Sequence, residues 1–188
     1  MQRISFVSHI SMYSHSRCGG ILVSAGERSF RDCLGQFASG VTVVTTLHGD
    51  LGTVHGATVS SFTSVSLRPP LVMVSLDRRS RLSALLAGGA FGVNVLAADQ
   101  GDLALRFAGR SDAPHEDIEW QDTGPAPRLA GSVAHFACGP WASYDGGDHL
   151  LYVGEVLSFD APGGEPLVFH SGAFHALRSA AGLGSARR

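Results

Sequence analysis

The most constraining feature of the sequence is a succession of short β-branched or apolar runs separated by turns rich in glycine and proline. Residues 41–46 are β-branched throughout and residues 71–76 are almost entirely apolar, as expected of strands. Similar runs cover residues 56–63, 91–96, 134–144, 150–160 and 166–170. Because strand follows strand, a doubly wound parallel sheet is not expected. The pattern predicts a mainly β protein built as a closed or partly closed antiparallel barrel.

Three short helical stretches interrupt the strands. The first begins near Glu27, places apolar residues at helical spacing and ends at Gly40. The second covers residues 82–86, and the third covers residues 99–107 with Asp99 in the N-cap position. Residues 109–130 contain three prolines and many acidic residues, which predicts a long surface loop.

Length and charge narrow the classes of partner. The 188 residues fit one domain, and a net charge of −2 gives no basic excess for nucleic acid. No run approaches the roughly 20 apolar residues of a membrane helix. Three cysteines without CxxC spacing indicate a reducing, cytoplasmic compartment.

We expect residues 1–26 to be a disordered extension, residues 27–178 to be the domain, and residues 179–188 to be a flexible tail.

Several common kinds of site find no support in the sequence. It contains no GxGxxG or GxxxxGK[ST] phosphate loop, no HExxH or CxxC metal motif and no GxSxG nucleophile elbow. We therefore expect no metal centre.

The densest group of candidate binding residues is the segment 55–62 (HGATVSSF), which precedes Pro69 and Pro70. Glycine and alanine let a ligand approach the backbone. The hydroxyls of Thr58, Ser60 and Ser61 could hold a phosphate. A planar heterocycle with a phosphate tail requires both features. The segment taken alone is equally consistent with an ordinary strand whose hydroxyls are satisfied internally.

Three other stretches carry polar groups in suggestive combinations. Residues 77–81 (DRRSR) could form an anion site before a helix, or a solvated loop. Residues 146–149 (GGDH) place a carboxylate beside an imidazole, which it could orient, or form a turn with a bystander histidine. Residues 170–175 (HSGAFH) could stack an aromatic ring on a flat ligand. In isolation, a strand that packs Phe174 into the core is the simpler interpretation.

Taken in order, these stretches match a longer pattern. The matching segments are Phe30-Arg31 and residues 34–45 (LGQFASGVTVVT), 58–67 (TVSSFTSVSL), 69–72 (PPLV), 91–96 (FGVNVL), 106–108 (RFA), 144–149 (YDGGDH), 154 (G) and 166–170 (PLVFH). In this order and wording the chain resembles the short-chain flavin reductase family, the reductase components of two-component flavin-dependent monooxygenases. The resemblance covers roughly residues 28–178.

The resemblance implies an FMN-binding split barrel, a Greek-key antiparallel β-barrel that works as a homodimer and binds flavin without a covalent bond. It implies that the ring and ribityl chain of the flavin are lined by Val54, His55, Gly56, Ala57, Thr58, Ser60 and Ser61. The phosphate end would follow Leu76, Asp77, Arg78, Arg79, Ser80 and Arg81, with Phe107 and Ala108 near the tail. The nicotinamide would lie at Asp148 and His149, with His170, Gly172 and Phe174 closing that side.

The function implied is hydride transfer from NADH or NADPH to FMN, with FAD as the other candidate flavin, to supply reduced flavin to a separate monooxygenase. Hydride transfer depends mainly on proximity and orientation, so we assign His149, the candidate catalytic residue, a positioning role. The backbone around residues 56–58 is the candidate donor to the reduced flavin. Two alternatives stay open: a flavin carrier or sensor of the same fold, and an enzyme of the pyridoxamine-phosphate oxidase type.

Overall fold

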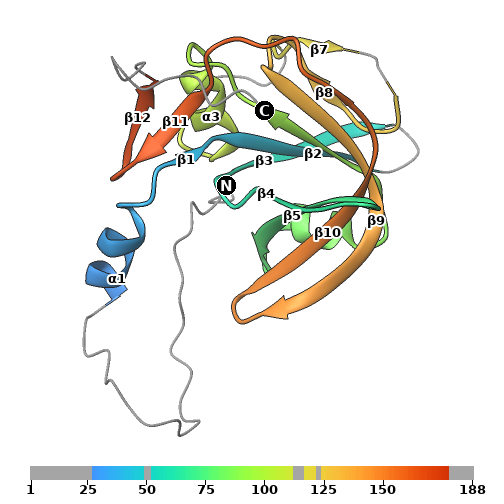
Figure 1. Ribbon diagram of the computed structural model, residues 1–188, viewed down its shortest axis with the longest axis horizontal. Coiled ribbons are helices and arrows are strands. Elements are labelled where there is room, and N and C mark those ends of the chain that lie inside the picture. The colour runs from blue at the N-terminus through green and yellow to red at the C-terminus, as the bar shows by residue number, and fades with distance from the viewer. Residues whose placement is uncertain (1–26, 49–51, 112–116, 122–123, 178–188) are drawn as a thin grey trace, which may run out of the picture.

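A computed structural model describes residues 27–48, 52–111, 117–121 and 124–177 (Figure 1). The predicted extension (residues 1–26) and tail (residues 179–188) lie outside the described residues. The main sheet has seven strands, all paired antiparallel, in the order β3-β2-β6-β9-β10-β5-β4. Its strands are β2 (Thr42–His48), β3 (Thr53–Val59), β4 (Thr63–Leu67), β5 (Pro70–Asp77), β6 (Phe91–Val95), β9 (Ala134–Gly146) and β10 (His149–Asp160). The expected mainly β antiparallel fold is confirmed.

Smaller elements surround this sheet. A three-stranded sheet joins β1 (Ser39–Gly40), β11 (Leu167–His170) and β12 (Ala173–Ala176), and a short ladder joins β7 (Trp120–Gln121) to β8 (Arg128–Leu129). The helices are α1 (Glu27–Leu34), α2 (Arg81–Leu86) and α3 (Gly101–Phe107). In Figure 1, α1 projects away from the barrel beside the small sheet. No helix among the described residues is long and apolar enough to cross a membrane.

The long hairpin of β9 and β10 curves around one side of the barrel (Figure 1). Its register shifts twice, between Val153 and Gly154 and again between Val156 and Ser158, and such bulges bend a strand. Gly154 meets the core here: a Cβ at this position would lie 2.5 Å from Phe91 Cζ and 2.9 Å from Cys138 Cβ. The absence of a side chain therefore lets β10 pass directly over the Phe91 ring.

Apolar side chains pack into two clusters on opposite faces of β2. The first fills the barrel and draws on the large strands and α2, with Val44, Val93, Leu86 and Phe91 among its members. The second packs α3 and β11 against the other face, through residues such as Val43. Cys138 belongs to the first cluster, and its burial raises the pKa of its thiol to about 12. That thiol is therefore protonated and unreactive at neutral pH.

Buried polar groups lie under β8. Asn94 donates to Val43 O at 3.0 Å and accepts from Leu129 N at 2.9 Å, which ties β8 to the main sheet. Nearby, Arg128 pairs with Asp160 at 2.6 Å. His135 is 3 % exposed, and its Nε2 has no hydrogen-bond partner among the described residues. Burial, and then the charge of Arg128, lower the pKa of His135 below its ordinary value of 6.5.

The lowered pKa of buried His135 predicts a loss of stability at mildly acidic pH. The unfolded chain takes up a proton near pH 6.5, whereas the folded state resists protonation. The contribution of neutral His135 to the free energy of unfolding is fully present above pH 6.5. It is lost as the pH falls through the lowered pKa of the folded state. We expect the unfolding midpoint in urea to fall between about pH 8 and about pH 5, the range in which histidines titrate. His135→Gln should flatten this dependence, and His175→Gln, at an exposed ring, should not.

Several local predictions were wrong. The first helix ends at Leu34, not at Gly40, because Gln36 N and Phe37 N bond to carbonyls three residues back and Gly40 then pairs with β11. Asp99 does not cap the third helix: the N-cap is Gln100, whose side chain bonds to Ala97 N and Ala130 O.

The remaining differences concern strands. The run 56–63 divides into β3 and β4, and the loop predicted over 109–130 contains the β7–β8 ladder. Strand β12 confirms the simpler interpretation of residues 170–175, a strand whose Phe174 packs against the core. In β4 the register shifts between Ser64 and Ser66, which makes this strand irregular. These short elements form where a partner strand is already in place, which the local sequence does not reveal.

Candidate functional site

Strand β3 carries most of the predicted flavin residues and divides them between its two faces. Gly56 faces α3: a Cβ there would lie 2.8 Å from the Phe107 ring. Thr58, on the same face, donates its hydroxyl to Ala104 O at 2.7 Å. Ala57 faces the barrel interior, and alternation places His55 on that side too. The small residue at 56 thus accommodates Phe107, and the Thr58 hydroxyl has an internal partner.

The backbone of β3 makes no ladder bonds along one edge within the described part of the chain. Among the described residues β3 is the terminal strand of the sheet and pairs only with β2. The peptide groups that point away from β2 make no ladder bonds, and they extend from Val54 to Thr58. An edge of this kind offers backbone N–H donors to a planar ligand.

Phe107 and Ala108 end α3, and both are buried, at 5 % and 0 % exposure. Phe107 packs against Gly56 and meets the Trp120 ring edge-on at 6.2 Å. The two residues thus support β3 from behind.

Ser61 bridges the split in the barrel. Its Oγ donates to Ser75 O and accepts from Ser75 N, each at 2.9 Å. This one hydroxyl therefore joins the segment after β3 to β5, replacing a backbone ladder between them. Ser60 is half-buried, and its side chain makes no hydrogen bond in the described part of the chain. Of the two predicted serines, Ser60 has the hydroxyl left for a ligand.

Because Ser61 joins two segments and Ser60 does not, we expect their replacement by alanine to reduce stability to different extents. Ser61→Ala leaves both backbone groups of Ser75 without their partner, so we expect the free energy of unfolding to fall by about 2 kcal/mol. Ser60→Ala should change it by less than about 0.5 kcal/mol. Urea unfolding of the two variants measures the difference, and equal losses would contradict the bridging role.

Most of the residues in the loop at the end of β5 that were predicted to bind phosphate are instead buried or bonded to other groups of the protein. Leu76 is buried in the core. Asp77 accepts from Arg79 at 2.9 Å, and this hydrogen bond lowers the pKa of the Asp77 carboxyl. Ser80 accepts from Ser83 N at 3.1 Å and caps α2. Arg78 turns to the β9–β10 hairpin.

Arg81 is the arginine of this loop whose guanidinium makes no hydrogen bond or ion pair with the described residues. It acts electrostatically on His55, whose pKa is lowered by burial and then by the charges of Arg81 and His48. The His55 ring lies edge-on to His48 at 5.7 Å, and its Nε2 is buried without a partner among the described residues. An exposed cation beside an unpaired ring nitrogen suits an anionic or hydrogen-bonding ligand group.

The tip of the β9–β10 hairpin holds Asp148 and His149. His149 Nδ1 lies 2.7 Å from Asp148 Oδ1, and the two side chains are 18 % and 22 % exposed. Asp148 Oδ2 is buried without a partner among the described residues. A carboxylate at this distance favours the tautomer with the proton on Nδ1, which leaves Nε2 as an acceptor. His149 pairs with Asp77 in the β10–β5 register.

The last group of predicted residues lies elsewhere in the molecule. His170, Gly172 and Phe174 belong to the β11–β12 hairpin. Phe174 packs edge-on against Phe169 at 5.6 Å. In Figure 1 this hairpin is well separated from the tip of β9–β10. Within one chain the structure brings residues 77–81 to residues 145–149 and leaves the β11–β12 hairpin apart.

The structure adds two residues that the sequence did not single out. Asp145 accepts from Arg78 across the loop and hairpin at 2.9 Å. Tyr152 bonds through its hydroxyl to Ser83 O at 2.7 Å, which fixes α2 beneath the site. Both contacts join segments 67 or more residues apart, so only a correct register between β5, α2 and β10 could have predicted them.

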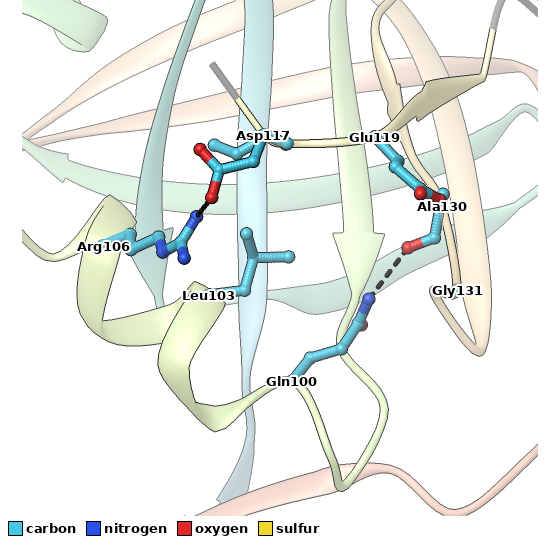
Figure 2. A pocket seen from close by; sticks show the side chains of 8 residues that line it. Gln100, Leu103, Arg106, Asp117, Glu119, Ala130 and Gly131 are labelled. Carbon is cyan, nitrogen blue, oxygen red and sulfur yellow. Dashed lines mark hydrogen bonds and ion pairs between the residues drawn. The ribbon is translucent and has the colours of Figure 1, made fainter. Parts of the chain in front are cut away.

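A separate pocket of about 280 Å³ lies between α3 and the β7–β8 region. Figure 2 shows Arg106 paired with Asp117, at 3.6 Å, and Gln100 bonded to Ala130. Its lining residues are Gln100, Leu103, Arg106, Asp117, Ile118, Glu119, Ala130 and Gly131. It contains none of the predicted site residues.

Comparison with known proteins identifies relatives of this arrangement. A family model described as a flavin reductase like domain matches residues 34–178. The chain is 43 % identical over 149 residues to an NADH-dependent flavin reductase of Rhodococcus sp, covering 78 % of this chain and 84 % of that protein. It is 44 % identical over 161 residues to the FMN reductase (NADH) SmoA of Agrobacterium fabrum, covering 82 % and 89 %.

A solved structure agrees. The styrene monooxygenase flavin reductase SMOB of Pseudomonas putida superposes with a TM-score of 0.74 at 35 % identity, covering 80 % of this chain and 98 % of that one. The resemblance and the split-barrel fold expected from the sequence are both confirmed by these matches.

Proposed function

The chain belongs to the family of flavin reductase like domains, and from this premise we propose that it transfers a hydride from NADH to a flavin, FMN or FAD. The observation that carries the proposal is the unpaired edge of β3, whose half-buried His55 is influenced electrostatically by the exposed cation Arg81 at the start of α2, a helix that contacts β3. That arrangement has donors for a planar ring and a charge for a phosphate tail.

Some of the residues predicted to bind flavin have groups left to hold it, and the others are bonded or packed within the fold. The backbone of Val54–Thr58 would face the ring, Ser60 would hold the ribityl chain and Arg81 the phosphate. His55, with its unpaired Nε2, would hydrogen-bond to the ring edge. Thr58, Ser61 and Phe107 support these groups from within the fold. When bound, the flavin supplies the redox chemistry and accepts the hydride of the nicotinamide.

The contribution of His149 is orientation. Asp148 holds the ring through Nδ1, so Nε2 is presented as an acceptor at the hairpin tip. An acceptor there can bind the carboxamide N–H of the nicotinamide and fix the position of its ring. By fixing the nicotinamide, His149 would supply proximity and orientation, which lower the barrier to hydride transfer. No proton transfer by His149 is needed.

We further propose that the protein is a homodimer in the cytoplasm that passes reduced flavin to a separate monooxygenase. The role of SMOB as a styrene monooxygenase flavin reductase supports the oxygenase partner. Large exposed apolar side chains support the dimer: Leu67 on β4 is 90 % exposed, Phe37 after α1 is 82 % and Phe159 on β10 is 75 %. Apolar surface on this scale is typical of an interface.

The decisive experiment is NADH oxidation by the purified protein, followed by loss of NADH absorbance with and without FMN or FAD. Rapid oxidation that depends on added flavin supports the reductase, and the ratio of rates identifies the preferred flavin. Tight flavin binding with no oxidation of NADH or NADPH would instead identify a flavin carrier or sensor. Light scattering during size-exclusion chromatography tests the dimer.

A further inference from the structure

Arg78 lies in the segment that the family resemblance associates with flavin phosphate, yet its contacts point elsewhere. Its guanidinium donates to Asp145 Oδ2 at 2.9 Å, to Gly147 O and to His149 O at 3.4 Å. Its backbone N–H donates to Asp148 O at 3.1 Å. Every one of these acceptors belongs to the tip of the β9–β10 hairpin.

Asp145 completes the arrangement from the other side. Its second oxygen, Oδ1, accepts from Gly147 N at 3.0 Å, and Gly147 has a φ of 82°, which glycine adopts without strain. The hydrogen bond from Arg78, and then that from Gly147 N, lower the pKa of the Asp145 carboxyl. One guanidinium and one carboxylate thus hold the turn between them.

We propose that Arg78 and Asp145 are positioning residues, which fix the turn at residues 146–149 and so place the His149 imidazole for nicotinamide binding. This inference rests on the proposed function. It assigns Arg78 to the nicotinamide side of the site and leaves the flavin phosphate to Arg81. The three side-chain hydrogen bonds all come from one nitrogen, Arg78 Nη2, so a single charged group meets all three acceptors of the turn.

The contact network should affect binding geometry more than stability. The side chains of Arg78 and Asp145 are 38 % and 71 % exposed, and an exposed ion pair contributes little to folding. Small movements of a positioning group, in contrast, affect binding and rate strongly. Variants at these positions should therefore stay folded and change the KM for NADH.

The test compares Arg78→Ala, Asp145→Asn and their double variant by steady-state kinetics with saturating flavin. Each single change should raise the KM for NADH about tenfold, by loss of charge-assisted hydrogen bonds. The double variant should be no worse than the poorer single variant, because both residues hold the same turn. Arg78→Lys, which keeps one charged nitrogen with three N–H donors, should recover part of the loss.

Flavin affinity, measured by fluorescence quenching, separates this role from phosphate binding. It should stay within about twofold in Arg78→Ala and fall about tenfold in Arg81→Ala, the matched arginine variant. Weakened flavin binding in Arg78→Ala with an unchanged KM for NADH would overturn the proposal. An unchanged KM and unchanged flavin affinity would overturn it as well.

Amide hydrogen exchange tests the positioning role without relying on catalysis. Residues 145–149 should exchange faster in Arg78→Ala and in Asp145→Asn, by similar factors, while β2 and β6 keep the wild-type protection. If the wild-type protein does not oxidise NADH, the proposed function fails while this readout still reports on the turn. Unchanged exchange at the turn would overturn the inference even in an active reductase.

Discussion

Replacing His149 by alanine is expected to raise the KM for NADH about tenfold, with the dissociation constant of the flavin changed by less than about twofold. The imidazole is held at Nδ1 by Asp148 at 2.7 Å, so its Nε2 acceptor is fixed before the nicotinamide arrives. Losing a fixed acceptor removes binding without altering the flavin edge of β3. Steady-state kinetics with varied NADH, together with flavin titration, measure both quantities.

A graded variant and a control sharpen this prediction. Asp148→Asn keeps the shape and one acceptor oxygen but weakens the hold on the ring, so its KM should lie between those of the wild type and His149→Ala. Ser143→Ala alters an exposed residue of the same hairpin and should behave as the wild type. An unchanged KM for NADH in His149→Ala would remove His149 from the nicotinamide site.

The largest expected effect on stability comes from Gly154→Ala, which should lower the free energy of unfolding by about 3 kcal/mol. The added Cβ would lie 2.5 Å from Phe91 Cζ and 2.9 Å from Cys138 Cβ. Phe91 and Cys138 are 2 % and 0 % exposed, so neither can move into solvent. For a chain of this length, thermal unfolding should shift downward by about 9 °C.

A second substitution distinguishes overpacking from a general loss of strand propensity. Phe91→Leu removes the ring atoms that the new methyl group would meet, so the double variant should be more stable than the sum of the single effects predicts. Gly40→Ala is the control, since a Cβ there meets nothing within 4 Å. Strictly additive losses in the Gly154 and Phe91 cycle would refute the steric account.

The sequence predicted the parts of this fold that depend on local pattern. The apolar runs that became β5, β6, β9 and β10 were recognised because buried strands need β-branched and apolar residues wherever they pair. The C-terminal end of α1 was not recognised, because it depends on the turn hydrogen bonds after Leu34 and on the pairing of Gly40 with β11. Propensity carries little information about two-residue strands such as β1, β7 and β8.

The candidate site, too, was predicted only in part from the sequence. Composition identified the polar segments, but it did not predict the direction in which each side chain points. Thr58 is bonded to Ala104, 46 residues away, and Arg78 to Asp145, 67 residues away. Those partners depend on how α3 and the β9–β10 hairpin pack on the barrel. A hydroxyl or guanidinium in a binding motif therefore cannot be assigned to a ligand until its internal partners are known.

The register shift in β4 has a consequence for the behaviour of the protein at high concentration. Strand β4 ends the main sheet, and Val65 and Leu67 expose 51 % and 90 % of their surface. A regular edge with such side chains would be a template for intermolecular strand addition and amyloid-like aggregation. The shift between Ser64 and Ser66 interrupts the run of unpaired peptide groups, and the two prolines after Arg68 offer no N–H to extend it. Removing the irregularity should convert a protected edge into an aggregating one.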